Sequence, residues 1–424
     1  MQDDRLKDCA PGRSEYGSLR ALLPDVPSGQ PSGHMDTPRT LPLVARVSRK
    51  AIFPALLVAL VLVAAGCAQI STPKGWSGGV ISGDALIIGT EDGTVLAVDK
   101  IEGTTLWVQG LRGEPEVDRA VYGTPAVAGD NVFVGGYDSI LYAYNTEGQE
   151  IWQEPLGGRI VGGPAVVGDL VIAGVALDDA EGGRQGRLYA FEADTGDSVW
   201  SFPTDGPIWS APAVSAGTVY FGTLGKVIFA VSVDNGQEVW RFETGGAVVA
   251  SPLIMGGRVY VGDFDSVFYA LNAQTGAFVW RFDGAARWYW AKAIAHKGTI
   301  YAPSLDGNLY ALDAASGRML WKYETEGAIV GSPVILGDRI IVPVADGDDS
   351  KISILELNGS FSAACKIGED VRTPLVADGD LIYFGVADHS IRALRIKSSG
   401  NPDEEWVYFT DREDPIPRER AKAC

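Results

Sequence analysis

The chain has 424 residues, with 54 acidic against 35 basic side chains, and its formal net charge at pH 7 is −19. An acidic chain without a basic stripe is a poor candidate for binding nucleic acid. Three histidines in the whole sequence make a histidine-based metal site implausible. The composition therefore indicates a solvated, exported surface.

The start of the chain has the features of an export signal. Arg46, Arg49 and Lys50 precede an apolar run from Ala51 to Ala65, and Gly66 follows it. A basic region, a short apolar run and a small-residue junction are typical of a secretory signal peptide. We expect the signal to span 35–66 and to begin at Met35, so residues 1–34 are a disordered leader or an upstream mis-start.

A cysteine stands directly after this junction. The residues Val63 to Cys67 resemble a bacterial lipobox, although the leucine usual three positions before the cysteine is Ala64 here. The resemblance implies cleavage before Cys67 and lipidation of its sulfur, with 67–75 as a tether. The alternative is a signal peptide that ends near a cysteine by chance.

Seven tryptophans recur at regular spacing through the rest of the chain. The first five gaps are 45, 48, 40, 40 and 41 residues, and the last is 85, which is two periods with one tryptophan missing. A period of this length marks a repeat architecture. The ladder consists of Trp107, Trp152, Trp200, Trp240, Trp280, Trp321 and Trp406.

Each repeat contains four short strands. Between Ser251 and Phe282, four apolar runs are separated by Gly256-Gly257, Asp265-Ser266 and Thr275-Gly276. Short β-branched and aromatic runs with such breaks indicate strands joined by hairpins. Because the unit recurs eight times without a linker-like break, we predict an all-β, eight-bladed β-propeller over 76–410 rather than two smaller domains. Residues 411–424 are a polar tail.

The repeat resembles that of the PQQ-like propeller family. The sixth repeat carries the motif most fully, in Gly298–Tyr301, Asp306–Ala314, Ser316-Gly317 and Trp321. The family includes the outer-membrane assembly factor BamB, the quinoprotein alcohol dehydrogenases and propellers with no known activity. The resemblance therefore implies the fold and leaves the function open.

The catalytic members of the family have recognisable site features. They carry two adjacent cysteines over the cofactor, bind Ca²⁺ through oxygen ligands and use an aspartate as base. The cysteines here, Cys9, Cys67, Cys365 and Cys424, include no adjacent pair, and no Ca²⁺ or base motif matches. We therefore expect no catalytic residue, no PQQ or other cofactor and no metal.

Three features outside the repeat motif leave alternatives. The acidic loops Asp346–Asp349 and Leu177–Gly186 could hold Ca²⁺, but we favour solvated loops. Cys365 and Cys424 could pair in an oxidising compartment, but we favour a buried free Cys365 and a loose terminus.

Aligning the repeats predicts a ring of side chains where the chain approaches each innermost strand, beside the axis of the propeller. The aligned position lies three residues before the proline that opens the strand, and Lys292 takes the proline's place in the sixth repeat. These side chains either pack between blades or form a binding surface. The ring comprises Trp76, Tyr122, Val161, Trp209, Val249, Tyr289, Val330 and Val371, with Trp288, Trp290, Lys292 and Arg372 close by.

The sixth repeat departs most from its siblings, and departures from a repeat are where function is expected. Lys292 beside Trp288, Tyr289 and Trp290 could bind a peptide carboxylate or another anion, or it could pair with a neighbouring carboxylate.

Together these features predict a monomeric, non-catalytic, lipid-anchored propeller on the cell surface or in the periplasm. It would bind an envelope protein or peptide in the manner of BamB and would not bind nucleic acid. Two alternatives stay open, namely a PQQ-dependent quinoprotein oxidoreductase and a ligand-sensing ectodomain.

Overall fold

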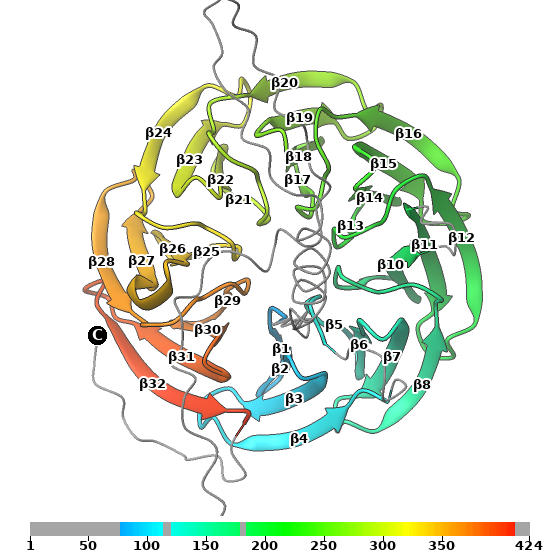
Figure 1. The fold of residues 1–424 in the computed structure, drawn as a ribbon, viewed down its shortest axis with the longest axis horizontal. Coiled ribbons are helices and arrows are strands. Elements are labelled where there is room, and N and C mark those ends of the chain that lie inside the picture. The colour runs from blue at the N-terminus through cyan, green and yellow to red at the C-terminus, as the bar shows by residue number, and fades with distance from the viewer. Residues whose placement is uncertain (1–76, 113–119, 179–183, 412–424) are drawn as a thin grey trace, which may run out of the picture. The chain divides into compact units, whose positions relative to one another are not determined.

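The computed structural model describes residues 77–112, 120–178 and 184–411. They form eight antiparallel sheets of four strands, arranged as blades in a ring around a common axis (Figure 1). The predicted all-β, eight-bladed propeller is confirmed. The leader, the signal peptide, Cys67, the tether and the polar tail lie outside the described residues.

Every blade is built from four consecutive strands, and the first of them lies nearest the axis. The first four blades comprise β1 (Val80–Ser82), β2 (Ala85–Gly89), β3 (Thr94–Asp99) and β4 (Thr105–Gly110); β5 (Ala126–Ala128), β6 (Asn131–Gly135), β7 (Ile140–Asn145) and β8 (Glu150–Pro155); β9 (Ala165–Val167), β10 (Leu170–Asp178), β11 (Arg184–Glu192) and β12 (Ser198–Thr204); and β13 (Ala213–Ser215), β14 (Thr218–Gly222), β15 (Val227–Ser232) and β16 (Glu238–Glu243).

The second half of the ring repeats this arrangement and adds one turn of 3₁₀ helix, η2 (Gly347–Asp349), in blade seven. Its blades comprise β17 (Leu253–Met255), β18 (Arg258–Gly262), β19 (Phe268–Asn272) and β20 (Phe278–Phe282); β21 (Ile294–His296), β22 (Thr299–Pro303), β23 (Asn308–Asp313) and β24 (Met319–Glu324); β25 (Val334–Leu336), β26 (Arg339–Val344), β27 (Lys351–Glu356) and β28 (Phe361–Lys366); and β29 (Val376–Asp378), β30 (Leu381–Val386), β31 (Ser390–Ile396) and β32 (Pro402–Phe409). No helix within these described ranges is long and apolar enough to cross a membrane.

The tryptophan ladder joins each blade to the next. Trp240 in β16 is 7% exposed, packs on Gly276 of blade five and donates its indole N–H to Ala273 O at 2.8 Å. Gly276 has a φ of +70°, and a Cβ there would lie 2.7 Å from the indole ring, so only glycine fits both the turn and the ring. Trp240 therefore packs against the neighbouring blade. The same ring-on-glycine contact joins Trp107 to Gly148, Trp152 to Gly196, Trp200 to Gly236, Trp280 to Gly317, Trp321 to Gly359 and Trp406 to Gly103.

The last of these contacts closes the ring. Because each blade uses four consecutive strands, no blade combines the two ends of the propeller. Trp406 of blade eight instead packs on Gly103 of blade one and donates its indole N–H to Lys100 O at 3.1 Å. The Lys100 ammonium also lies 2.7 Å from a carboxylate oxygen of Asp378. Side-chain contacts of the kind found at the other junctions therefore complete the propeller.

Blade seven lacks a ladder tryptophan, and the structure shows how its space is filled. In the other blades the tryptophan lies opposite an alanine of the third strand, as Trp240 lies opposite Ala230. In blade seven this pair is Ile354 and Ala363, so the larger side chain has moved to the third strand. The Arg339 guanidinium reaches blade eight instead and donates to the carbonyls of residues 397 and 398.

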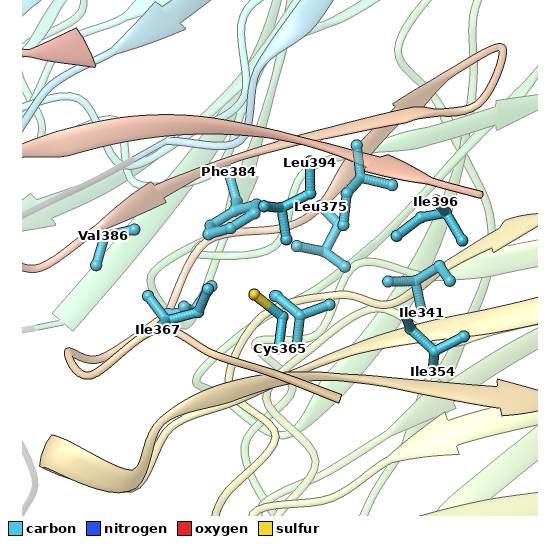
Figure 2. Packing of buried hydrophobic residues seen from close by; sticks show 12 residues of the cluster. Ile341, Ile354, Cys365, Ile367, Leu375, Phe384, Val386, Leu394 and Ile396 are labelled. Carbon is cyan, nitrogen blue, oxygen red and sulfur yellow. The ribbon is translucent and has the colours of Figure 1, made fainter. Parts of the chain in front are cut away.

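Cys365 belongs to this same junction. Figure 2 shows it among apolar side chains of blades seven and eight, including Ile367, Leu375 and Phe384. Cys365 is buried and disulfide-bonded, so the preferred prediction of a free thiol is wrong. The three other cysteines lie outside the described part of the chain. Sequence spacing could not decide this, because pairing depends on which segments the fold brings together.

Candidate functional site

The connectors, which run from the outer strand of one blade to the innermost strand of the next, lie on one face of the propeller. They lie beside the turns between the second and third strands, because Phe264 N–H donates to Ala247 O and Leu305 N–H donates to Trp288 O, both at 2.9 Å. We call this side the connector face. The connectors contain all the ring residues predicted from the repeats that the structure describes.

The register of two connectors differs from the predicted one. The innermost strand of blade six begins at Ile294, so Ala293, and not Lys292, takes the proline position. In blade eight the strand begins at Val376, which places Leu375 there instead of Pro374. Because extended side chains alternate in direction, a shift of one residue exchanges the buried and the exposed set.

With the corrected register, one column of equivalent positions, with one residue from each connector, is buried between blades. Tyr289 and Val371, both predicted in the ring, are 0% exposed. Tyr289 packs on Gly262 so closely that a Cβ there would lie 2.3 Å from it, and burial raises the pKa of its hydroxyl well above the ordinary value. Tyr289 and Val371 therefore pack between blades, which is the first of the two alternatives expected for these positions. The buried column is Val121, Ile160, Ile208, Val248, Tyr289, Ile329 and Val371.

The corrected ring brings Trp290 and Arg372 into the positions first given to Tyr289 and Val371. Most of these side chains are partly or fully exposed, but Val249 is buried. Trp76 lies outside the described residues. The described ring is Tyr122, Val161, Trp209, Val249, Trp290, Val330 and Arg372.

Four aromatic rings form a row across blades four, five and six. Phe264 lies between Trp288 and Trp290, with ring centroids 4.8 Å and 5.8 Å away and nearly parallel planes. Trp290 meets Trp209 edge to face, with a centroid distance of 6.5 Å. Sequence reasoning missed Phe264, because it belongs to a turn of blade five and meets these tryptophans only when the next blade packs beside it.

The connector of blade six alternates strictly between exposed and buried side chains. Trp288 and Lys292 are exposed and Trp290 is partly exposed, whereas Tyr289, Ala291 and Ala293 are buried. This period of two is that of an extended chain with one face packed. Trp288, Trp290 and Lys292 therefore share the outward face, which we call the blade-six strip.

Backbone contacts hold this connector in place. Ala286 N–H donates to an Asp306 carboxylate oxygen at 2.8 Å, and Tyr289 N–H donates to Asp263 O at 3.2 Å. Burial raises the pKa of Asp306, but the hydroxyl of Tyr310 and backbone donors outweigh it and leave that pKa below its ordinary value. Hydrogen bonds to blades five and six therefore fix the backbone that carries the strip.

Lys292 is the unusual side chain of the strip. Its backbone N–H donates to Ser332 Oγ at 3.0 Å, but its ammonium makes no hydrogen bond or ion pair with another described residue. The alternative of a neighbouring carboxylate partner is therefore unsupported. Desolvation lowers the pKa of Lys292, because protein atoms surround the ammonium even though solvent reaches it. The equivalent positions carry Gly78, Thr124, Gly163, Ala211, Ser251, Ser332 and Pro374.

Arg372, by contrast, already has a partner. Its Nε donates to the Asp370 carboxylate at 3.0 Å, and the same carboxylate accepts Gly347 N–H at 2.9 Å and the Ser350 hydroxyl at 3.0 Å. Burial raises the pKa of Asp370, but Arg372 and these donors more than offset it and leave it lowered. Asp370 therefore ties the connector of blade eight to the blade-seven turn, and Arg372 pairs with this carboxylate within the connector.

The two acidic loops show no metal site in the parts that the structure describes. Asp349 lies 2.7 Å from the Lys366 ammonium, and Asp346 N–H donates to Ser350 Oγ at 2.8 Å. No group of three or more potential ligands is close enough to hold a metal within the described ranges. Residues 179–183 of the blade-three loop fall outside those ranges.

Comparison with known proteins gives a consistent family. A sequence profile described as "Outer membrane protein assembly factor BamB" matches residues 91–207, 184–287 and 265–420. BamB of Shewanella oneidensis is 31% identical over 111 residues, which are 24% of this chain and 26% of that protein. Quinohemoprotein alcohol dehydrogenase ADH IIB of Pseudomonas putida is 36% identical over 125 residues, which are 26% of this chain and 17% of the enzyme.

Each of these matches therefore spans about a quarter or less of the relative's own length. Among solved structures, BamB of Moraxella catarrhalis superposes with a TM-score of 0.57 at 23% identity, covering 68% of this chain and 85% of that one. At this identity the superposition supports the propeller fold alone.

Proposed function

Because this chain belongs to the family of the outer membrane protein assembly factor BamB, we propose that it is a non-catalytic propeller that binds another protein of the cell envelope. In this proposal the signal 35–66 directs export, and lipid on Cys67 holds the monomeric propeller at a membrane. The observation that carries it is the family match, which runs through all eight blades from residue 91 to 420.

Two features of the molecule support binding over chemistry. The connector face presents partly exposed aromatic rings from three blades, and aromatic side chains are enriched at protein interfaces. The sequence also lacks the adjacent cysteines that the catalytic relatives carry.

A PQQ-dependent oxidoreductase is the second candidate, since quinohemoprotein alcohol dehydrogenase ADH IIB is among the relatives. Dye-linked alcohol oxidation by the purified protein, measured with added PQQ and Ca²⁺, separates the two candidates. We expect no turnover and no stoichiometric PQQ complex. A submicromolar PQQ complex with alcohol oxidation would replace the scaffold proposal.

The scaffold proposal is tested by cross-linking in the native envelope, followed by purification of the protein and mass spectrometry. The wild type should pellet with membranes and carry one recurrent envelope protein, whereas Cys67→Ser should leave the membrane fraction or stay unprocessed. Recovery of the wild-type protein without any enriched partner would contradict the proposal, and so would a wild-type chain that retains an unlipidated leader.

A further inference from the structure

We propose that the blade-six strip binds the carboxyl-terminal end of an extended peptide, with the terminal carboxylate on Lys292 and apolar side chains on Trp288 and Trp290. This inference rests on the proposed partner-binding function and specifies the chemistry that the connector face recognises.

The spacing of the strip matches an extended chain. Trp288, Trp290 and Lys292 are separated by two residues each and face outward together. At ~3.3 Å per residue, the strip extends over roughly 13 Å. An extended peptide has the same repeat, so its last residue and those two and four positions before it meet Lys292, Trp290 and Trp288 in turn.

The positive charge of Lys292 favours binding of the carboxyl terminus of the peptide. Lys292 is a cation without a carboxylate partner among the described residues, and the equivalent positions of the other blades carry no charge. A charge-assisted hydrogen bond to a carboxylate satisfies such an ammonium, and this bond is stronger where the surroundings are partly desolvated. Burial around Lys292, which lowers its pKa, is consistent with that setting.

Two carboxylates beside the blade-six strip disfavour a peptide ligand with acidic side chains. Asp306 lies under the start of the connector, where it accepts Ala286 N–H, and Asp265 follows Phe264 in the neighbouring turn. Both lie toward the aromatic end of the strip, since Asp306 contacts the backbone two residues before Trp288 and Asp265 adjoins the ring that stacks on Trp288. Further negative side chains on the ligand would be repelled there, so one terminal carboxylate preceded by apolar residues fits best.

The aromatic end supplies apolar contact area. Trp288 is 37% exposed, and Phe264 stacks on one side of its ring, so the ring is held in one orientation. Rigid aromatic rings offer contact area at a small entropic cost, because few rotamers are lost on binding.

The test uses the purified full chain and a fluorescent pentapeptide with phenylalanine at positions one and three. Fluorescence anisotropy compares the free carboxylate with the same peptide ending in an amide. The wild type should prefer the carboxylate about tenfold. Lys292→Met should abolish this preference and retain amide-level binding, whereas Trp288→Ala should weaken both peptides by a similar factor.

Lys226→Met is the matched control, because Lys226 is an exposed lysine in a turn on the same face, and it should keep the full preference. Circular dichroism melting should place all variants within a few degrees of the wild type. Equal wild-type affinity for acid and amide, no binding of either peptide, or a preference that survives Lys292→Met would each overturn the proposal.

Free PQQ, a small molecule that also carries carboxylates, is titrated as a competitor. It should not displace the peptide at equimolar concentration, and Lys292-dependent displacement would make the strip a cofactor site instead. Partner capture from the envelope is the separate readout of the scaffold. If Lys292→Met captures the partner as the wild type does, only the peptide inference fails.

Discussion

Tryptophan occupies two different settings in this propeller. Trp240 on the outer rim is 7% exposed, its N–H is satisfied and its ring covers a glycine of the next blade. Trp288 on the connector face is 37% exposed and stacks only against Phe264 among the described aromatic rings. The first setting repeats around the ring and holds blades together, whereas the second is confined to the aromatic row of blades four to six. Repetition therefore indicates a structural role, and departure from the repeat indicates where a partner would bind.

The largest expected effect is the loss of a ladder ring. Trp240→Ala should cost about 3–5 kcal/mol of unfolding free energy, because it leaves a cavity between two blades and removes the indole donor from Ala273 O, which keeps only the Tyr220 hydroxyl. Equilibrium urea denaturation measures this. A cost near zero would remove the distinction between the two settings.

The glycine under the ring gives a smaller and more specific effect. Gly276→Ala should destabilise by about 2–3 kcal/mol, since it combines left-handed backbone strain with a clash against the indole. Gly256→Ala is the matched control, because its φ is +58° and nothing lies within 4 Å of the added Cβ, so about 1–2 kcal/mol is expected. Equal losses would show that the ring contact contributes nothing.

Blade seven, which lacks the ladder tryptophan, offers a further test of how the ladder stabilises the propeller. Ala363→Trp should cost about 1–3 kcal/mol through overpacking against Ile354. Adding Ile354→Ala should recover part of this cost, because the pair then has the composition found in the other blades. A double-mutant cycle measures the coupling, and strict additivity would contradict the proposed exchange of volume.

The smallest expected effect on stability is at the strip. Trp288→Ala should change the unfolding free energy by less than about 1 kcal/mol, because the ring is partly exposed and its N–H makes no hydrogen bond to another described residue. The same denaturation assay applies, and a loss as large as that of Trp240→Ala would make Trp288 a structural residue.

The repeat architecture was predictable because it is carried by local patterns. Turn glycines, short apolar strands and ladder tryptophans such as Trp240 recur in each unit, and the packing rule is the same at every junction. The eight blades and the position of the ladder therefore follow from one sequence.

The candidate site was only partly predictable. Trp288, Trp290 and Lys292 were found because blade six departs from the repeat. Whether Tyr289 packs between blades or faces outward could not be decided, because no proline marks the register there and a one-residue shift reverses the direction of the side chain. Phe264 and the bonded state of Cys365 depend on contacts between segments distant in the chain, which spacing alone does not encode.

Photo-cross-linking in the native envelope tests the central claim most directly. A photoreactive amino acid replaces Trp288 in one variant and Val239 in another, since Val239 is also exposed, at 48%, but lies on the outer strand of blade four. The account predicts a discrete adduct with one envelope protein from position 288 and none from position 239. Adducts from position 239 alone, or none from either position, would contradict the assignment of binding to the blade-six strip.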